Sequence, residues 1–277
     1  MMQFSLFEQI ALAIFLLSGI SFFLYHLLLR LKIILKGKSD FSIDQLPKRI
    51  ARVFDEVILH KKVASGKRKS AGILHALVMY GFIFFGLITI NHFGMAFGLP
   101  IFSDSIRHAY FLFFGAPWAI LCSIGILGLA YRRFVIKPEA LGKFSSTSAI
   151  VSVFIVTLMV TYLIDEFHIL SGAAEKFNWW LHSGVIGGFL FLIPQSKHMH
   201  LVLSPFNIFL RPFEVPSHGA IPIDMEASEE ELDNLLLDLS RLSKDQALDI
   251  FTCVECGRCT DVCPANRGGG ILDPKYH

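Results

Sequence analysis

The chain has 277 residues, of which 53% are hydrophobic and only 17% are charged. Together with a mean hydropathy of +0.56, this composition excludes an ordinary soluble domain and predicts an all-α integral membrane protein. The net charge of +2 gives no reason to expect a nucleic-acid partner, whereas the lipid bilayer is the expected surroundings of so apolar a chain.

Five apolar segments are long enough to cross a membrane as helices. The first has no short apolar core and no small-residue cleavage site, so we expect a retained helix and not a signal peptide. The fifth begins at the aromatic pair Trp179 and Trp180, which is typical of a membrane interface, and continues as a helix towards His200. The predicted spans are residues 4–35, 71–97, 109–131, 148–164 and 179–193.

The loops between these segments alternate in their content of lysine and arginine. The richer loops are residues 36–70, 132–143 and 197–211, and twelve Lys or Arg lie between Arg30 and Lys69. The positive-inside rule places such loops in the cytoplasm. We therefore expect an N-terminus outside the cell and a C-terminus in the cytoplasm. A second role for the first basic loop, docking an acidic partner, stays open.

The pattern divides the chain into three regions. Prolines between residues 205 and 222 indicate an extended linker. The sequence Ser243-Lys-Asp-Gln246 is a capping box, which predicts a helix that leads to Cys253. The expected regions are a five-helix membrane domain at 1–204, a cytoplasmic linker at 205–242 and a partial ferredoxin-like helical segment at 243–277.

Four of the five cysteines form the run C-x2-C-x2-C-x3-C-P, which is typical of bacterial ferredoxins. This spacing indicates a [4Fe–4S] cluster, because a zinc site usually has two separated cysteine pairs. In two-cluster ferredoxins the fourth cysteine binds the other cluster, and no second run follows here. We prefer the interpretation that the chain is a fragment; the alternatives are that Cys263 closes the cluster or that a partner supplies a ligand. The candidate ligands are Cys253, Cys256, Cys259 and Cys263.

Histidines in membrane helices are candidates for function, because ionisable groups are costly there. His182 and His200 are eighteen residues apart, five helical turns or ~27 Å, close to the ~30 Å hydrocarbon core. His75 and His92 are seventeen residues apart on the antiparallel second span. His75 therefore reaches the level of His200, and His92 that of His182, which predicts two b haems with two histidines each. Since His92 lies ~100° off the face of His75, His168 is the alternative fourth ligand.

The fourth span ends in a group of ionisable residues, Asp165, Glu166 and His168. Carboxylates and imidazoles are the side chains that most often transfer protons. We prefer the interpretation that the group is an ordinary polar cluster at the end of a helix. The alternative is proton transfer at an outer quinone site between His92 and His182.

The segment from His182 to Pro205 resembles the fifth span of the respiratory nitrate reductase gamma subunit, a membrane cytochrome b with two haems. The shared features are the two histidines eighteen residues apart, the turn Pro194-Gln-Ser-Lys-His-Met-His200 and a following Ser-Pro. The beginning of the second span at Leu74-His75 and the sequence His92-Phe-Gly-Met95 are also similar, although the family's two histidines there are closer together. The resemblance covers roughly residues 1–210.

With the cysteine run added, the chain looks like the fused membrane subunits related to heterodisulfide reductase, including electron-transfer-flavoprotein:menaquinone oxidoreductases. The resemblance implies an oxidoreductase subunit of a respiratory chain in the prokaryotic cell membrane. Such a subunit passes electrons between menaquinone, or another quinone, and a cytoplasmic flavoprotein or disulfide-reductase-like catalytic subunit. The alternatives are a haem-free membrane anchor for a ferredoxin module, and a transporter or sensor regulated by an iron–sulfur cluster.

Overall fold

The computed structural model describes residues 3–38, 41, 43–142, 144–213, 226, 228 and 242–275. These residues form helices, turns and coil, with no strand among them, in agreement with the predicted all-α class. Contacts divide the chain into two compact units, each assembled from separate segments. The first unit comprises Met1–Phe22, Lys62–Leu192 and Cys256–His277, and the second comprises Phe23–Lys61 and Ile193–Glu255.

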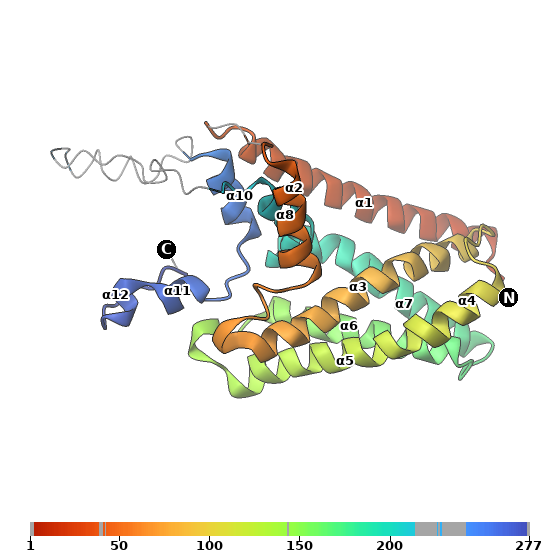
Figure 1. Cartoon of the computed structure of the whole chain (residues 1–277). Coiled ribbons are helices and arrows are strands. Elements are labelled where there is room, and N and C mark those ends of the chain that lie inside the picture. Colours follow the sequence, from red (N-terminus) through yellow and green to blue (C-terminus); the bar gives the residue numbers. More distant parts are fainter. Residues whose placement is uncertain are drawn as a thin grey trace. The chain divides into compact units, whose positions relative to one another are not determined.

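The first unit is built on a bundle of long helices in which α5 packs against α3 and α6, and α6 packs against α7 (Figure 1). A short helix, α4, precedes α5 and joins it through a π-helical turn at Phe111–Gly115. The N-terminal part of α1 belongs to the same unit. The helices are α1 (Leu6–Ile34), α3 (Lys69–Ala96), α4 (Asp104–Tyr110), α5 (Ala116–Tyr131), α6 (Ser146–Glu166) and α7 (Ala173–Leu192).

Small residues allow α3 and α5 to approach closely. A Cβ atom on Gly81 would lie 2.9 Å from the sulfur of Cys122, and one on Gly125 would lie 2.7 Å from the carbonyl oxygen of Leu74. Glycine at a helix contact therefore lets two backbones pack by van der Waals contact, which matters in lipid because apolar surface gains nothing there by leaving water.

Four stretches are long and apolar enough to cross a membrane, namely Leu6–Ile34, Lys69–Ala96, Asp104–Ile136 and Ser146–Glu166. They correspond to the first four predicted spans. The predicted fifth span corresponds to α7, whose first turns carry Glu175, Lys176 and Asn178. These polar residues lower the mean hydropathy of α7, which is not among the four stretches that are apolar enough to cross a membrane.

The prediction of one helix carrying both His182 and His200 is wrong. The helix α7 ends at Leu192, 3₁₀ turns follow at Ile193–Gln195 and Lys197–Met199, and α8 begins at His200. Pro194 has no N–H with which to continue the helix. Ser196 has an extended backbone (φ −132°, ψ 172°), and its hydroxyl accepts a hydrogen bond from the His198 N–H. The two histidines therefore lie in different helices and different units, not on one helical face.

The second unit contains α2 (Leu46–Val53), α8 (His200–Leu210) and α10 (Lys244–Thr252). Arg49 on α2 is only 1% exposed. Its guanidinium donates to the carbonyl oxygens of Asp44 (2.7 Å), Phe209 (2.8 Å) and Arg211 (3.2 Å). Because the last carbonyls of a helix have no partner within it, this buried arginine closes the end of α8.

Helix α10 begins as the sequence predicts. The Ser243 hydroxyl accepts from the Gln246 N–H, and the Gln246 side chain accepts from the Ser243 N–H, which is a complete capping box. Asn207 of α8 donates to Asp249 (2.7 Å) and Thr252 (2.9 Å), and so ties α8 to α10.

The beginning of the predicted linker is helical and not extended, since Pro205 lies inside α8. Most of the remaining linker, residues 214–225 and 229–241, lies outside the described residues.

Candidate functional site

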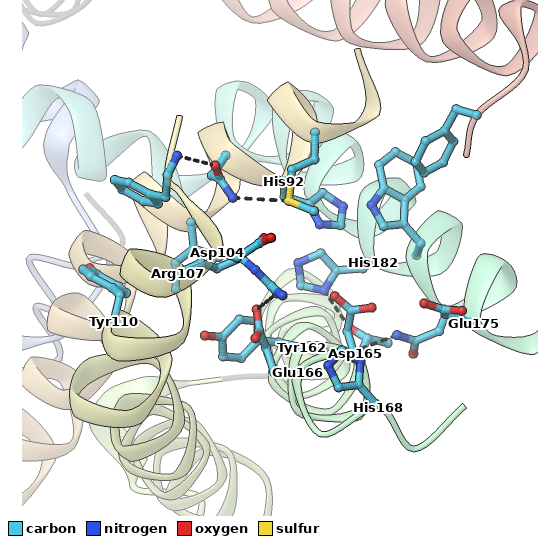
Figure 2. Close-up of a pocket in the computed structure, with 18 residues that line it drawn as sticks. His92, Asp104, Arg107, Tyr110, Tyr162, Asp165, Glu166, His168, Glu175 and His182 are labelled. Atoms are coloured by element: carbon cyan, nitrogen blue, oxygen red, sulfur yellow. Dashed lines mark hydrogen bonds and ion pairs between the residues drawn. The ribbon is translucent and has the colours of Figure 1, made fainter. Parts of the chain in front are cut away.

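A cavity of about 290 Å³ lies in the first unit, where α3 and α6 end and α4 and α7 begin (Figure 2). This volume is close to the lower end of the range for small-molecule sites, about 300 Å³. Apolar and aromatic side chains line it beside an unusual number of ionisable groups. Its titratable lining residues are His92, Asp104, Arg107, Tyr110, Tyr162, Asp165, Glu166, His168, Glu175 and His182.

The cavity brings together His92 and His182, the two histidines that the sequence places at the same depth. Their ring centroids are 5.0 Å apart and their planes are tilted by 53°. Figure 2 shows the two imidazoles facing one another, His92 from α3 and His182 from α7. His168, the alternative fourth ligand, lines the same cavity.

A hydrogen bond orients the ring of His182. Its Nδ1 lies 2.7 Å from the hydroxyl oxygen of Thr161, which also lies 2.7 Å from the carbonyl oxygen of Thr157 and 3.2 Å from that of Leu158. With the hydroxyl hydrogen on one of these carbonyls, His182 donates from Nδ1 and its Nε2 keeps the lone pair. This is the arrangement found in metal-binding histidines, whose second nitrogen donates to an oxygen. The donor chemistry of His182 therefore fits an iron ligand.

His92 is held differently. Its Nε2 lies 2.9 Å from the Ser183 hydroxyl, and its ring stacks on Trp179 with centroids 4.7 Å apart and planes 14° from parallel. To bind iron through Nε2, His92 would have to give up the Ser183 hydrogen bond. The orientation of the ring, held by Trp179, does not depend on that bond.

Acidic and basic groups line the opposite wall of the cavity. Arg107 of α4 forms an ion pair with Glu166 of α6, with 3.0 Å between Nη1 and Oε1. Asp165 is the neighbour of Glu166, and Figure 2 shows both carboxylates directed towards the space in front of His182. The Arg107–Glu166 pair thus joins α4 to the end of α6 across the cavity.

Two asparagines that sequence reasoning missed hold the walls in place. The buried Asn91 accepts from the N–H groups of Ile101 (2.9 Å) and Phe102 (3.0 Å), and so anchors the loop before α4 to α3. Asn178 donates to the carbonyl of Thr161 (2.9 Å) and ties α7 to α6. A polar residue inside an apolar segment was the available signal, but its partner lies far away in the sequence.

The other predicted histidine pair is divided between the units. His75 lies in the second turn of α3 in the first unit, and His200 is the first residue of α8 in the second. The Nδ1 of His200 donates to the carbonyl of Lys197 (2.9 Å), which leaves Nε2 with its lone pair. Burial lowers the pKa of His200, so the imidazole is neutral at pH 7, as a metal ligand must be. His200 therefore also fits an iron ligand.

The motif cysteines surround the short helix α11 (Arg258–Val262) and precede α12 (Pro264–Arg267). All four thiols are free. Within the described residues, no group of three or more His, Cys, Asp or Glu side chains is arranged to hold a metal ion. The unit boundary falls between Glu255 and Cys256, so Cys253 belongs to the second unit and the other three cysteines belong to the first. Thiol chemistry and spacing fit an iron–sulfur cluster, and the assignment stays a prediction.

Two arginines attach the cysteine segment to the basic stretch before α3, a contact that we call the arginine clasp. Arg258 donates to the carbonyls of Lys62 and Val63, both at 2.7 Å. Arg68 donates to the carbonyls of Cys256 and Gly257 and pairs with Asp261. Part of the basic loop therefore has a structural role beyond membrane topology.

No protein-family model matches the chain, and no solved structure does. The chain is 31% identical over 282 residues to the "Probable iron-sulfur-binding oxidoreductase FadF" of Bacillus subtilis, a match that covers 91% of this chain and 39% of that protein. It is 24% identical over 309 residues to the "EtfAB:quinone oxidoreductase" of Syntrophomonas wolfei, covering 95% of this chain and 41% of that protein. The chain thus spans about two fifths of the length of these relatives. Over nearly all of its own length, it is similar to oxidoreductases whose names mention iron–sulfur binding or a quinone.

Proposed function

We propose that the chain is the membrane electron-transfer part of a quinone-linked oxidoreductase. It passes electrons between a quinone, such as menaquinone, and a cytoplasmic iron–sulfur oxidoreductase. The observation that carries this proposal is the cavity in which His92 and His182 meet opposite Asp165 and the Arg107–Glu166 pair. The names of the two relatives, which mention iron–sulfur binding and a quinone, support the same function.

The proposed cofactors are two b haems and one [4Fe–4S] cluster. His92 and His182 would hold the haem beside the cavity, with His168 as the alternative to His92, and His75 and His200 would hold the other. Bound in this way, haem and cluster supply one-electron redox chemistry, which protein side chains alone do not provide. The proposed cluster ligands are Cys253, Cys256, Cys259 and Cys263; since the chain spans only part of its relatives, a fourth ligand from elsewhere stays open.

The chain's own residues have three tasks in this proposal. Thr161 and Lys197 orient the imidazoles of His182 and His200 through their Nδ1 hydrogens. Trp179 holds the ring of His92. The arginine clasp holds the cysteine segment against the residues that lead into α3.

The proposed orientation follows from the distribution of charge. With basic residues 36–70 in the cytoplasm of a prokaryotic cell, the cavity lies near the outer surface and the cysteines lie inside. The cytoplasmic partner would be a flavoprotein or a disulfide-reductase-like subunit. Electron flow in either direction is compatible with this arrangement.

A reduced-minus-oxidised absorption spectrum of the purified chain tests the proposal, with menadiol as the soluble quinol. We expect the spectrum to contain the α-band of b haem. One addition of menadiol should be enough to make this band appear. Iron and acid-labile sulfide should be present, and should be lost in Cys256→Ser but not in Cys122→Ser. A chain with the cluster but without the b-type band would be a ferredoxin anchor or an iron–sulfur-regulated transporter or sensor, and the haem proposal would be wrong.

A further inference from the structure

Two polar groups in the lining of the cavity make no hydrogen bond within the described residues. The Nε of Arg107 is buried and makes no hydrogen bond within the described residues. In the same part of the chain, no hydrogen bond or ion pair involves the carboxylate of Asp165. A buried unpaired donor is uncommon and calls for a partner such as a ligand oxygen. Both groups line the cavity.

The position of Asp165 is unfavourable for the helix that carries it. Asp165 and Glu166 are the last two residues of α6, where the negative end of the helix dipole disfavours a carboxylate. Glu166 is compensated by its ion pair with Arg107. Asp165 makes no ion pair of this kind in the described residues, and Arg107 and His168 act on its charge only from a distance, so its carboxylate oxygens remain available to a ligand in the cavity.

An exit for protons lies next to Asp165. The His168 N–H donates to the backbone carbonyl of Asp165 (3.0 Å), and this turn keeps the exposed His168 at the edge of the same cavity. Figure 2 shows the side chains of Asp165 and His168 on neighbouring turns. The cavity therefore reaches solvent close to the carboxylate of Asp165, which gives a proton taken up there a short way out.

From these contacts we propose that Asp165 is the base that accepts protons from a quinol bound in the cavity, and that Arg107 Nε donates a hydrogen bond to a ring oxygen of the quinol. Oxidation of one quinol breaks two O–H bonds. Asp165 takes the two protons in turn and releases each to solvent at the exposed edge of the cavity. The two electrons leave one at a time to a one-electron acceptor of the b-haem class, and a quinone with two carbonyl groups remains. This inference rests on the proposed function.

The test compares Asp165→Asn with the unchanged full-length chain in detergent, using menadiol as reductant. We expect the rate of haem reduction to fall about 100-fold, as for loss of a general base. The dissociation constant for menadione, measured by quenching of tryptophan fluorescence, should change less than about threefold. Arg107→Gln should weaken menadione binding about tenfold, because a hydrogen bond to a charged donor is lost. Asp165→Glu should recover most of the rate, and Glu139→Gln, which removes a carboxylate elsewhere, should not change it.

The outcomes separate this inference from the proposed function. If the unchanged chain neither binds menadione nor is reduced by menadiol, the proposed function fails and this inference fails with it. If the unchanged chain is reduced and Asp165→Asn is reduced equally fast, the inference alone is overturned. Normal haem bands are required of each variant as proof of folding. Asp165→Ser, judged by the same rate, replaces the asparagine variant if those bands are missing.

Discussion

The hydroxyl oxygen of Thr161 lies 2.7 Å from Nδ1 of His182 and 2.7 Å from the carbonyl oxygen of Thr157. In the tautomer in which Nδ1 donates to Thr161, Nε2 of His182 keeps its lone pair for a metal. We expect Thr161→Val to reduce the affinity for the haem beside the cavity about 10–100-fold, as for loss of other such partners. Haem content per chain after extensive washing measures the effect. Thr157→Val, one turn earlier on α6, is the matched control, and equal haem loss in both variants would contradict the role of Thr161.

His200 and His198 provide a second matched pair. Their ring centroids are 6.2 Å apart, but only His200 donates from Nδ1 to a backbone carbonyl, that of Lys197. Burial, with smaller effects from His200 and Lys197, lowers the pKa of His198 to about 4. Burial lowers the pKa of His200 as well, so both rings are neutral at pH 7 and charge does not distinguish them. We expect His200→Ala to remove one of two haems and His198→Ala to retain both, as counted by the pyridine haemochrome spectrum. If His198→Ala alone loses a haem, then His198 and not His200 is the ligand.

The arginine clasp gives a prediction for the cluster. Arg68 places a positive charge against the carbonyls of Cys256 and Gly257. A nearby cation stabilises the reduced, more negative form of a cluster, so Arg68→Gln should make its reduction potential more negative. An interaction of about 1.4 kcal/mol corresponds to a shift of roughly 60 mV for one electron. An EPR-monitored redox titration measures the shift, with Lys69→Gln as the control, and an unchanged or more positive potential would refute the argument.

Arg49 is expected to determine the stability of the second unit. It is buried and bonds three carbonyl oxygens, two of them at the end of α8. Arg49→Met would leave the carbonyls of Asp44 and Phe209 without this donor, whereas the carbonyl of Arg211 keeps a hydrogen bond from Arg52. At a cost of about 3 kcal/mol, the midpoint of thermal unfolding should fall by several degrees. Because α8 begins at His200, the haem at that residue should be lost before the one at His182. Lys48→Ala, on the exposed side of α2, should have almost no effect on thermal stability. A similar fall of the unfolding midpoint in both variants would contradict the role of Arg49.

The local features of the chain could be predicted well, because each depends on neighbours in the sequence. Hydropathy over some twenty residues gives the first four spans, and the capping box gives the beginning of α10 at Lys244. The break after α7 could also have been predicted from Pro194, yet the eighteen-residue spacing favoured an unbroken helix. That spacing has no geometric meaning once 3₁₀ turns separate His182 from His200.

The candidate site could be predicted only in part. Residue type and depth indicated His92 and His182 as neighbours, and their rings do lie 5.0 Å apart. No sequence pattern indicates a partner for Arg107, which pairs with Glu166, 59 residues further along the chain. Nothing in the sequence around Thr161, Asn91 or Asn178 indicates the partners that these side chains have in the folded chain.

The sequence by itself determined an all-helical chain with apolar segments long enough to cross a membrane and a ferredoxin-type cysteine run. Composition, periodicity and motif spacing act over short stretches of chain, so they need no fold to be recognised. Only the tertiary structure brought Nδ1 of His182 to the hydroxyl of Thr161 and placed Asp165 in the lining of the same cavity. It also gathered the ends of four helices around one cavity. Those outcomes depend on hydrogen bonds between residues distant in sequence, and such bonds exist only after the helices have packed.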